Sequence, residues 1–83
     1  MLRDVVEVKP LGRKRIFVRF EDGVAGEVDL AEVIEFTGIF AALLDDKEFA
    51  RVRVDKELGT IVWPNGADVA PELLYDCVTR QQV

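Results

Sequence analysis

Apolar and polar residues alternate with a period of two through the first third of the chain, which is the pattern of half-buried β-strands. The segments that show it are 5–9, 15–20 and 24–28. Pro10 and Gly12 close the first segment, and the turn-forming sequence Glu21-Asp22-Gly23 separates the other two. Connections this short join antiparallel neighbours, so the sequence predicts a three-stranded antiparallel meander.

After residue 28 the spacing of apolar residues changes to that of a helix. Asp29 can cap this helix with Glu32 as its capping-box partner, and Gly38 is placed to end it in the left-handed conformation. A second helical turn follows, and its apolar residues are Phe40, Leu43 and Leu44. Phe49 is expected to anchor the core. The sequence therefore predicts a short helical middle segment.

Alternation returns in the last third of the chain. Segments 51–55 and 60–63 predict a second β-hairpin, and the turn-forming sequence Pro64-Asn65-Gly66 ends it. Pro71 suits the first turn of a C-terminal helix. The apolar face of that helix consists of Leu73, Leu74, Cys77 and Val78. Residues 79–83 are predicted to form a frayed tail. These elements define a small α+β fold.

The chain has 83 residues, which is the size of one domain, so we assign 1–83 to a single unit. Hydrophobic residues make up 49% of it, and a small domain with that share often hides some of them in an oligomer interface; a homodimer would do this. The net charge of −5 repels phosphate and argues against direct nucleic-acid binding. No apolar run is long enough for a membrane span, and we expect a cytoplasmic protein.

The chemistry available for catalysis is narrow. The sequence has no histidine, which removes the commonest general base and metal ligand. Its one cysteine, Cys77, falls on the apolar stripe of the last helix, where a structural role is expected. The acidic clusters lack the spacing of a calcium loop. We therefore expect no enzyme activity, no metal and no cofactor.

Two groups of residues are candidates for binding a partner. Arg15, Phe17 and Arg19 share the face of the second strand opposite its apolar residues, and Arg13 and Lys14 extend the basic stretch. This face could bind nucleic acid or an acidic partner, the protein partner being favoured by the net charge, or it could be a solvated face. Trp63, Asn65 and Asp68 surround a turn. That turn is either a recognition loop with an exposed aromatic ring or a structural turn, in which Asn65 and Gly66 take positive φ and Asp68 accepts backbone N–H groups.

Several stretches together resemble the bacterial domain-of-unknown-function family numbered 2442. They are Phe20-Glu-Asp-Gly23, Gly26-Glu-Val-Asp-Leu30, Phe49-Ala-Arg-Val-Arg-Val-Asp55, Gly59-Thr-Ile-Val-Trp-Pro-Asn-Gly-Ala-Asp68 and Pro71-Glu-Leu-Leu-Tyr75. The resemblance covers about residues 4 to 78 and implies a small α+β domain. Some members of the family carry a helix-turn-helix domain after this one, and members often lie beside the gene of another small protein. It supplies no catalytic residues, and the sequence shows no phosphate-binding glycine loop for the molybdenum-cofactor label that some relatives have carried.

These observations favour a non-enzymatic protein–protein interaction module. Its expected partner is an unidentified protein, encoded by a neighbouring gene in a toxin–antitoxin-like pair in which this chain is the acidic member. The alternative is a nucleic-acid-linked regulatory module that acts through a partner or a fused DNA-binding domain. A small-molecule site would need a concave pocket beside the turn at 63–68.

Overall fold

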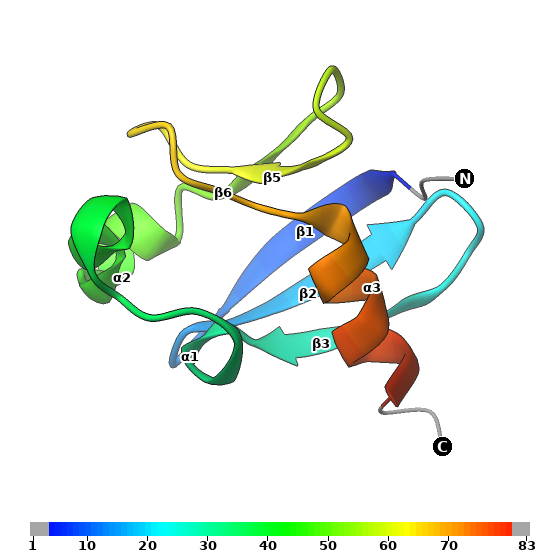
Figure 1. Cartoon of the computed structure of the whole chain (residues 1–83), viewed down its shortest axis with the longest axis horizontal. Helices are drawn as coiled ribbons and strands as arrows, with labels where there is room; N and C mark the ends of the chain where they lie inside the picture. The colour runs from blue at the N-terminus through cyan, green and yellow to red at the C-terminus, as the bar shows by residue number, and fades with distance from the viewer. Residues whose placement is uncertain (1–3, 81–83) are drawn as a thin grey trace.

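The computed structural model describes residues 4–80 and consists of two three-stranded antiparallel sheets and short helices (Figure 1). The strands are β1 (Val5–Gly12), β2 (Arg15–Phe20), β3 (Ala25–Asp29), β4 (Arg53–Asp55), β5 (Thr60–Val62) and β6 (Asp68–Val69). The helices are α1 (Leu30–Val33), the 3₁₀ helix η1 (Gly38–Leu44), α2 (Asp46–Phe49) and α3 (Pro71–Arg80). Sheet A has the order β1-β2-β3 and sheet B the order β4-β5-β6. The predicted α+β class is confirmed.

Sheet A is the predicted meander. The inward residues of β2, namely Ile16, Val18 and Phe20, are at most 1% exposed, as the alternation required. The turn between β2 and β3 uses Gly23 at φ +92°, a conformation that glycine adopts without strain. In β3, Gly26 lets α3 approach closely, since a Cβ there would lie only 3.0 Å from Val78 Cγ1.

Strand β1 is longer than predicted because it continues through Pro10 to Gly12. Proline is tolerated there because β1 is an edge strand of sheet A. Two register shifts interrupt its pairing with β2, and the extra residues, Val6 and Leu11, are about half exposed. The hairpin then turns through two residues, Arg13 and Lys14, which have φ values of +54° and +64°.

The helical middle is present, but its boundaries differ from the prediction. Helix α1 has a single turn capped by the Asp29 carboxylate, which accepts the Ala31 N–H, and it ends where Ile34 becomes extended. Gly38 has the predicted positive φ, but it begins η1 instead of ending α1. Ile34 and Phe36 turn back onto the core in between, which is why the first helix stops early.

Helices η1 and α2 carry the chain from sheet A to sheet B. Leu43 and Phe49 are buried as predicted, whereas Leu44 is 60% exposed and is not a core residue. Asp45 caps α2 by accepting the Lys47 N–H at 2.8 Å. Phe49, the last residue of α2, is therefore fixed at the point where the two sheets meet.

Sheet B contains the predicted hairpin, but with shorter strands and a third strand that the sequence did not reveal. Strand β4 begins at Arg53, and β5 ends at Val62. The additional strand, β6, has only two residues, which pair with Ile61 and Val62 of β5. The Thr60 hydroxyl also donates a hydrogen bond to the Val69 carbonyl. This side-chain bond helps to hold a strand too short to form alone.

Helix α3 begins at Pro71 as predicted and lies across sheet A in Figure 1. Leu74 and Val78 are buried, Cys77 is half-buried, and Leu73 is 41% exposed, so Leu73 does not belong to the buried face. The edge of the Tyr75 ring packs on Phe20 with ring centroids 4.9 Å apart.

Helix α3 extends through Thr79 and Arg80, the first two residues of the segment predicted to fray. The Thr79 hydroxyl donates to the Tyr75 carbonyl at 2.9 Å, and Arg80 pairs with Asp76 at 3.0 Å. The remaining residues of that prediction, 81–83, lie outside the described residues.

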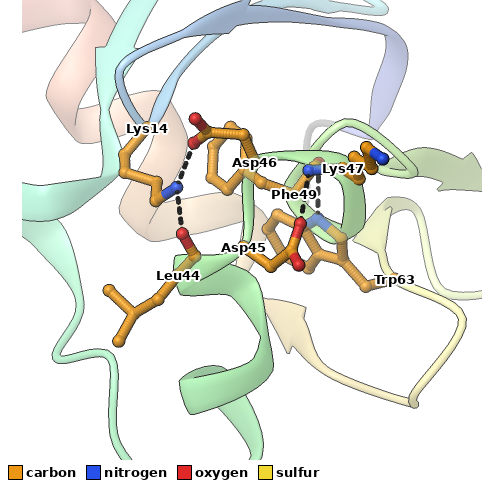
Figure 2. Close-up of polar contacts among 7 residues, drawn as sticks. All are labelled: Lys14, Leu44, Asp45, Asp46, Lys47, Phe49 and Trp63. Carbon is orange, nitrogen blue, oxygen red and sulfur yellow. Dashed lines mark hydrogen bonds and ion pairs between the residues drawn. The ribbon is translucent and has the colours of Figure 1, made fainter.

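One lysine connects the β1–β2 turn to the helical middle (Figure 2). Lys14 Nζ donates to the Leu44 carbonyl at 2.8 Å, pairs with Asp46 and lies 5.4 Å from the centre of the Phe49 ring. The same ring packs beside Trp63, whose indole N–H donates to the Phe49 carbonyl at 2.9 Å. The Lys14 side chain is only 15% exposed, so its contacts are screened less than those of a surface pair.

Two adjacent leucines of α3 test the burial pattern. Leu74→Ala removes a fully buried side chain, and we expect it to lower the free energy of unfolding by about 2–5 kcal/mol. Leu73→Ala, the matched control, should cost less than about 1 kcal/mol because Leu73 is partly exposed. Urea denaturation measures both, and equal losses would contradict the assignment of the buried face.

The lysine contact is tested by Lys14→Met, which keeps the aliphatic stem over Phe49 and removes the charge. The Leu44 carbonyl loses its donor, and we expect a loss of about 1 kcal/mol in the free energy of unfolding. Lys47→Met is the control, because the Lys47 ammonium makes no ion pair with a described residue. An equal effect of the two substitutions in thermal unfolding would argue against a structural role for Lys14.

Candidate functional site

The outer face of sheet A is the candidate site, because it carries the predicted group Arg15, Phe17 and Arg19. We define the outer face by the residues Glu7, Lys9, Arg15, Phe17, Arg19 and Glu27. The antiparallel register places them together: Glu7 lies opposite Arg19, and Lys9 and Glu27 lie on either side of Phe17. The alternation of β2 predicted which residues share this face, whereas their neighbours from β1 and β3 depend on the pairing register.

The charges of the outer face are paired with one another. Arg19 Nε donates to Glu7 at 2.9 Å, Lys9 Nζ lies 3.3 Å from the same carboxylate, and Arg15 pairs with Glu27. Each side chain is between about one-third and two-thirds exposed, so solvent screens each pair and its contribution to stability is small. Their main effect is to fix positive and negative groups at defined positions.

Phe17 lies at the centre of this charged surface. Its ring is flanked by Lys9, whose ammonium is 5.9 Å from the ring centre, and by the Arg19 guanidinium at 5.7 Å. Cations at this distance are attracted to the face of an aromatic ring. The arrangement holds a half-buried aromatic ring beside two arginines, and aromatic residues and arginine are the types enriched at protein–protein interfaces.

The second predicted group, Trp63, Asn65 and Asp68, belongs to sheet B and its turn. Trp63 is 1% exposed, so its ring is part of the core and not a surface anchor. The Asn65 amide donates to the Ile39 carbonyl at 2.9 Å and its oxygen accepts the Ala67 N–H, which ties the turn to η1. The structural interpretation of this turn therefore fits these two residues.

Two details of that interpretation differ from the prediction. Only Gly66 has a positive φ, at +92°, and Asn65 acts through its side chain. The Asp68 carboxylate is exposed on β6 and accepts no hydrogen bond from a described residue, so it does not cap the following turn. Asp68 is the one member of this group that presents a charged group to solvent.

Comparison with known protein families identifies the fold unit. The family model described as a protein of unknown function, DUF2442, matches residues 5–79, from the first residue of β1 to the last turn of α3. The chain belongs to the DUF2442 family. No curated protein and no solved structure matches it.

The DUF2442 chain also has a cavity of about 240 Å³ that the sequence did not reveal. Its lining is Val28, Asp29, Glu32, Val33, Cys77 and Arg80. These residues come from β3, α1 and α3, and no local motif links segments so far apart in sequence. Burial, with a smaller contribution from Asp76, raises the pKa of the Cys77 thiol, which disfavours the thiolate that nucleophilic chemistry needs.

Residues 4–80 contain neither a metal-binding cluster nor a membrane-spanning helix. No group of three His, Cys, Asp or Glu side chains there is close enough to hold a metal ion. No helix in this range is long and apolar enough to cross a membrane. A second cavity, of about 220 Å³, lies between the start of β1 and the β4–β5 hairpin and is lined by Asp4, Val5, Val6, Glu21, Val54, Lys56 and Gly59. It lies away from the outer face and from the β3–α3 cavity.

The charge pairing of the outer face predicts a titration. The Arg19 hydrogen bond, reinforced by Lys9, holds the pKa of Glu7 below its usual value of 4.5. Because this pKa is lower in the folded state, the stabilisation is complete above the ordinary value and is lost as the pH falls through the folded value. Carboxyl NMR should give a Glu7 midpoint below 4.5 that rises toward it in Arg19→Gln. Arg15→Gln, which unpairs Glu27 instead, should leave the Glu7 midpoint unchanged, and a shift in this control would contradict the assignment.

Proposed function

We propose that this DUF2442 chain is a protein-binding module without catalytic activity of its own, and that the outer face of sheet A is its contact surface. The observation that carries the proposal is the combination on this face of a central aromatic ring with ordered charges of both signs. No described element covers the face, whereas the opposite face of the same sheet is packed into the core.

Such a face suits a protein partner because its shape is fixed in advance. The β-ladders set the spacing of the side chains, and the ion pairs restrict their rotamers, so less conformational entropy is lost on binding. Phe17 would supply the desolvated anchor, and the surrounding charges would supply orientation and partner selection. The net charge of −5 favours a partner that is basic overall.

The same pairing counts against the alternative of direct nucleic-acid binding. In the basic stretch 13–19 that suggested phosphate contacts, Lys14, Arg15 and Arg19 are each paired with a carboxylate of this chain. Arg13 forms no ion pair with a described residue, so it is the one basic residue of the stretch that could meet a phosphate without displacing a carboxylate. At the other three, a phosphate would have to displace the paired carboxylates and approach a surface that stays acidic overall. A regulatory role would therefore act through a protein partner or a fused domain.

For the partner we retain the expectation drawn from the family resemblance. It is a second small protein encoded beside this chain in a bacterial, cytoplasmic, toxin–antitoxin-like pair. A homodimer through the same face is the competing arrangement. The two arrangements predict different oligomeric states for the purified protein, since only a homodimer would have twice the mass of one chain in solution.

The test is capture of the partner by the tagged chain from cells that express it at native level, with quantitative mass spectrometry. We expect one stoichiometric partner, and we expect Phe17→Ser to reduce its recovery at least tenfold, an order of magnitude typical of a lost aromatic anchor. Leu44→Ser is the matched control, because Leu44 is 60% exposed but lies outside the outer face.

Light scattering on the purified chain accompanies the capture. A dimer that Phe17→Ser converts to a monomer would favour self-association. The absence of any stoichiometric partner, together with a monomeric mass, would contradict the proposal.

A further inference from the structure

The two edges of sheet A are protected to very different degrees. Edge strand β1 contains Pro10 and two bulges, and its first N–H, that of Val5, donates to the Gly59 carbonyl of the other sheet at 2.9 Å. Such features prevent another strand from pairing. Edge strand β3 has no proline and pairs with β2 in unbroken register over all five residues. In Figure 1 no strand lies beyond β3.

Backbone groups of β3 point to this open edge. On either side of the strand, the Val24 carbonyl accepts a bond from β2 at 2.8 Å and the Leu30 N–H donates one at 2.9 Å toward the start of β2. Hydrogen-bonded pairs alternate along an antiparallel ladder, so residues of even number in β3 bond to β2 and those of odd number face outward. The N–H and carbonyl of Glu27 and the N–H of Asp29 therefore face the edge.

The β3–α3 cavity opens beside the same edge, on the inner side of the sheet. Val28, Val33 and Cys77 form its apolar wall, and Asp29 and Glu32 supply two carboxylates. Arg80 also lines the cavity, and its guanidinium is paired with Asp76 at 3.0 Å. Residues opposite one another on neighbouring strands point to the same face. A strand added to β3 would therefore direct the side chain opposite Val28 into this cavity.

The charges around the edge select what can occupy it. Glu27 and Asp29 lie on β3, Glu32 on α1 and Glu35 in the loop after it. Glu27 is paired with Arg15, whereas Glu32 has no ion pair with a described residue. A second copy paired through β3 would bring these carboxylates against each other, which is destabilising. A segment with lysine or arginine would instead lay its aliphatic stem along the apolar wall and its charge beside Glu32.

We propose that the β3 edge binds an extended Lys- or Arg-bearing segment of the partner protein as a fourth strand, with one basic side chain in the β3–α3 cavity. This inference rests on the proposed function, since it assigns the chemistry of the partner. It extends the outer face at Glu27, so a single partner could contact both. Backbone hydrogen bonds would supply affinity, and the cavity would supply selectivity.

The test is an NMR titration of the ¹⁵N-labelled chain with a short capped peptide of alternating lysine and valine, up to millimolar concentration. The control peptide has glutamate in place of each lysine. We expect shifts at Glu27, Asp29 and Cys77 and slower amide exchange at Glu27 with the lysine peptide only. Equal shifts from the two peptides, shifts centred elsewhere, or no shifts would overturn the proposal.

Substitutions sharpen the test. Glu32→Lys should weaken the lysine peptide roughly tenfold or more, because it places like charge in the cavity. Glu57→Lys makes the same change in net charge in the exposed β4–β5 turn and should leave affinity within about twofold, since its only effect is long-range and screened. Equal weakening by both would mean nonspecific attraction and would overturn the proposal.

The backbone contacts have their own variants. Glu27→Pro removes the outward N–H at an edge position where proline is compatible with a strand, and it should abolish binding. If this variant fails to fold, a peptide N-methylated at alternate residues removes the peptide's own donors, and it should not bind the unmodified chain. Binding that survives N-methylation would exclude strand addition.

The experiments distinguish failure of the strand-addition proposal from failure of the proposed function. If the unmodified chain captures a partner and Glu32→Lys captures it equally well, the strand-addition proposal fails and the interaction module stands. If no partner is captured, the proposed function fails, and the peptide titration still decides whether the edge binds basic strands.

Discussion

The fold depends on the contact between Phe49 and Trp63. The Trp63 indole N–H donates to the Phe49 carbonyl, and the two rings pack 5.9 Å apart, so the end of α2 is fixed against the end of β5. Lys14 reaches this junction from sheet A and covers the other side of the Phe49 ring. Three segments far apart in the sequence are thereby held at one point. The left-handed conformation of Lys14 costs roughly 1–2 kcal/mol, and these contacts offset it.

This junction determines which surfaces remain for function. The inner face of sheet A is covered from one side by sheet B and from the other by α3, and both approaches need small or apolar residues, as Gly26 against Val78 shows. Every second side chain of β2 points to the outer face, because the side chains of a strand alternate between the two faces of a sheet. Two of those side chains, Arg15 and Arg19, are charged and can stay in solvent without a covering element, and their pairing with Glu27 and Glu7 holds them beside the half-buried Phe17.

The sequence predicted the structural features that depend on local residue patterns. It did not predict the features that depend on contacts between segments far apart in the chain. The alternation at 15–20 identified both the buried residues of β2 and the group Arg15, Phe17 and Arg19. Strand β6 was missed because two residues carry no periodicity and pair only once β5 is in place. Gly38 was predicted to end α1 but begins η1. Its positive φ could be predicted from the residue type alone, whereas the end of α1 is set by Ile34 and Phe36, which reach the core.

The candidate site also combines features that the sequence predicts with features that depend on contacts between distant segments. Its central strand was predictable, but the partners Glu7 and Glu27 follow from register, and the cavity joining Glu32 to Cys77 follows from how α3 docks. The burial of Trp63 was one of two open interpretations, and its 1% exposure and its hydrogen bond to the Phe49 carbonyl at the end of α2 distinguish them.

The protection of the two edges of sheet A suggests why the chain is acidic at β3. Proline and bulges block every approaching strand, whatever its charge, and β1 uses both. Carboxylates repel acidic strands, and among the described residues they are the barrier that β3 has. That protection prevents self-pairing of an acidic chain and at the same time leaves the edge open to a basic segment. An edge that is protected by charge alone keeps the chain from pairing with itself and still allows a basic strand to bind. An edge that is blocked by proline and bulges could not bind any strand.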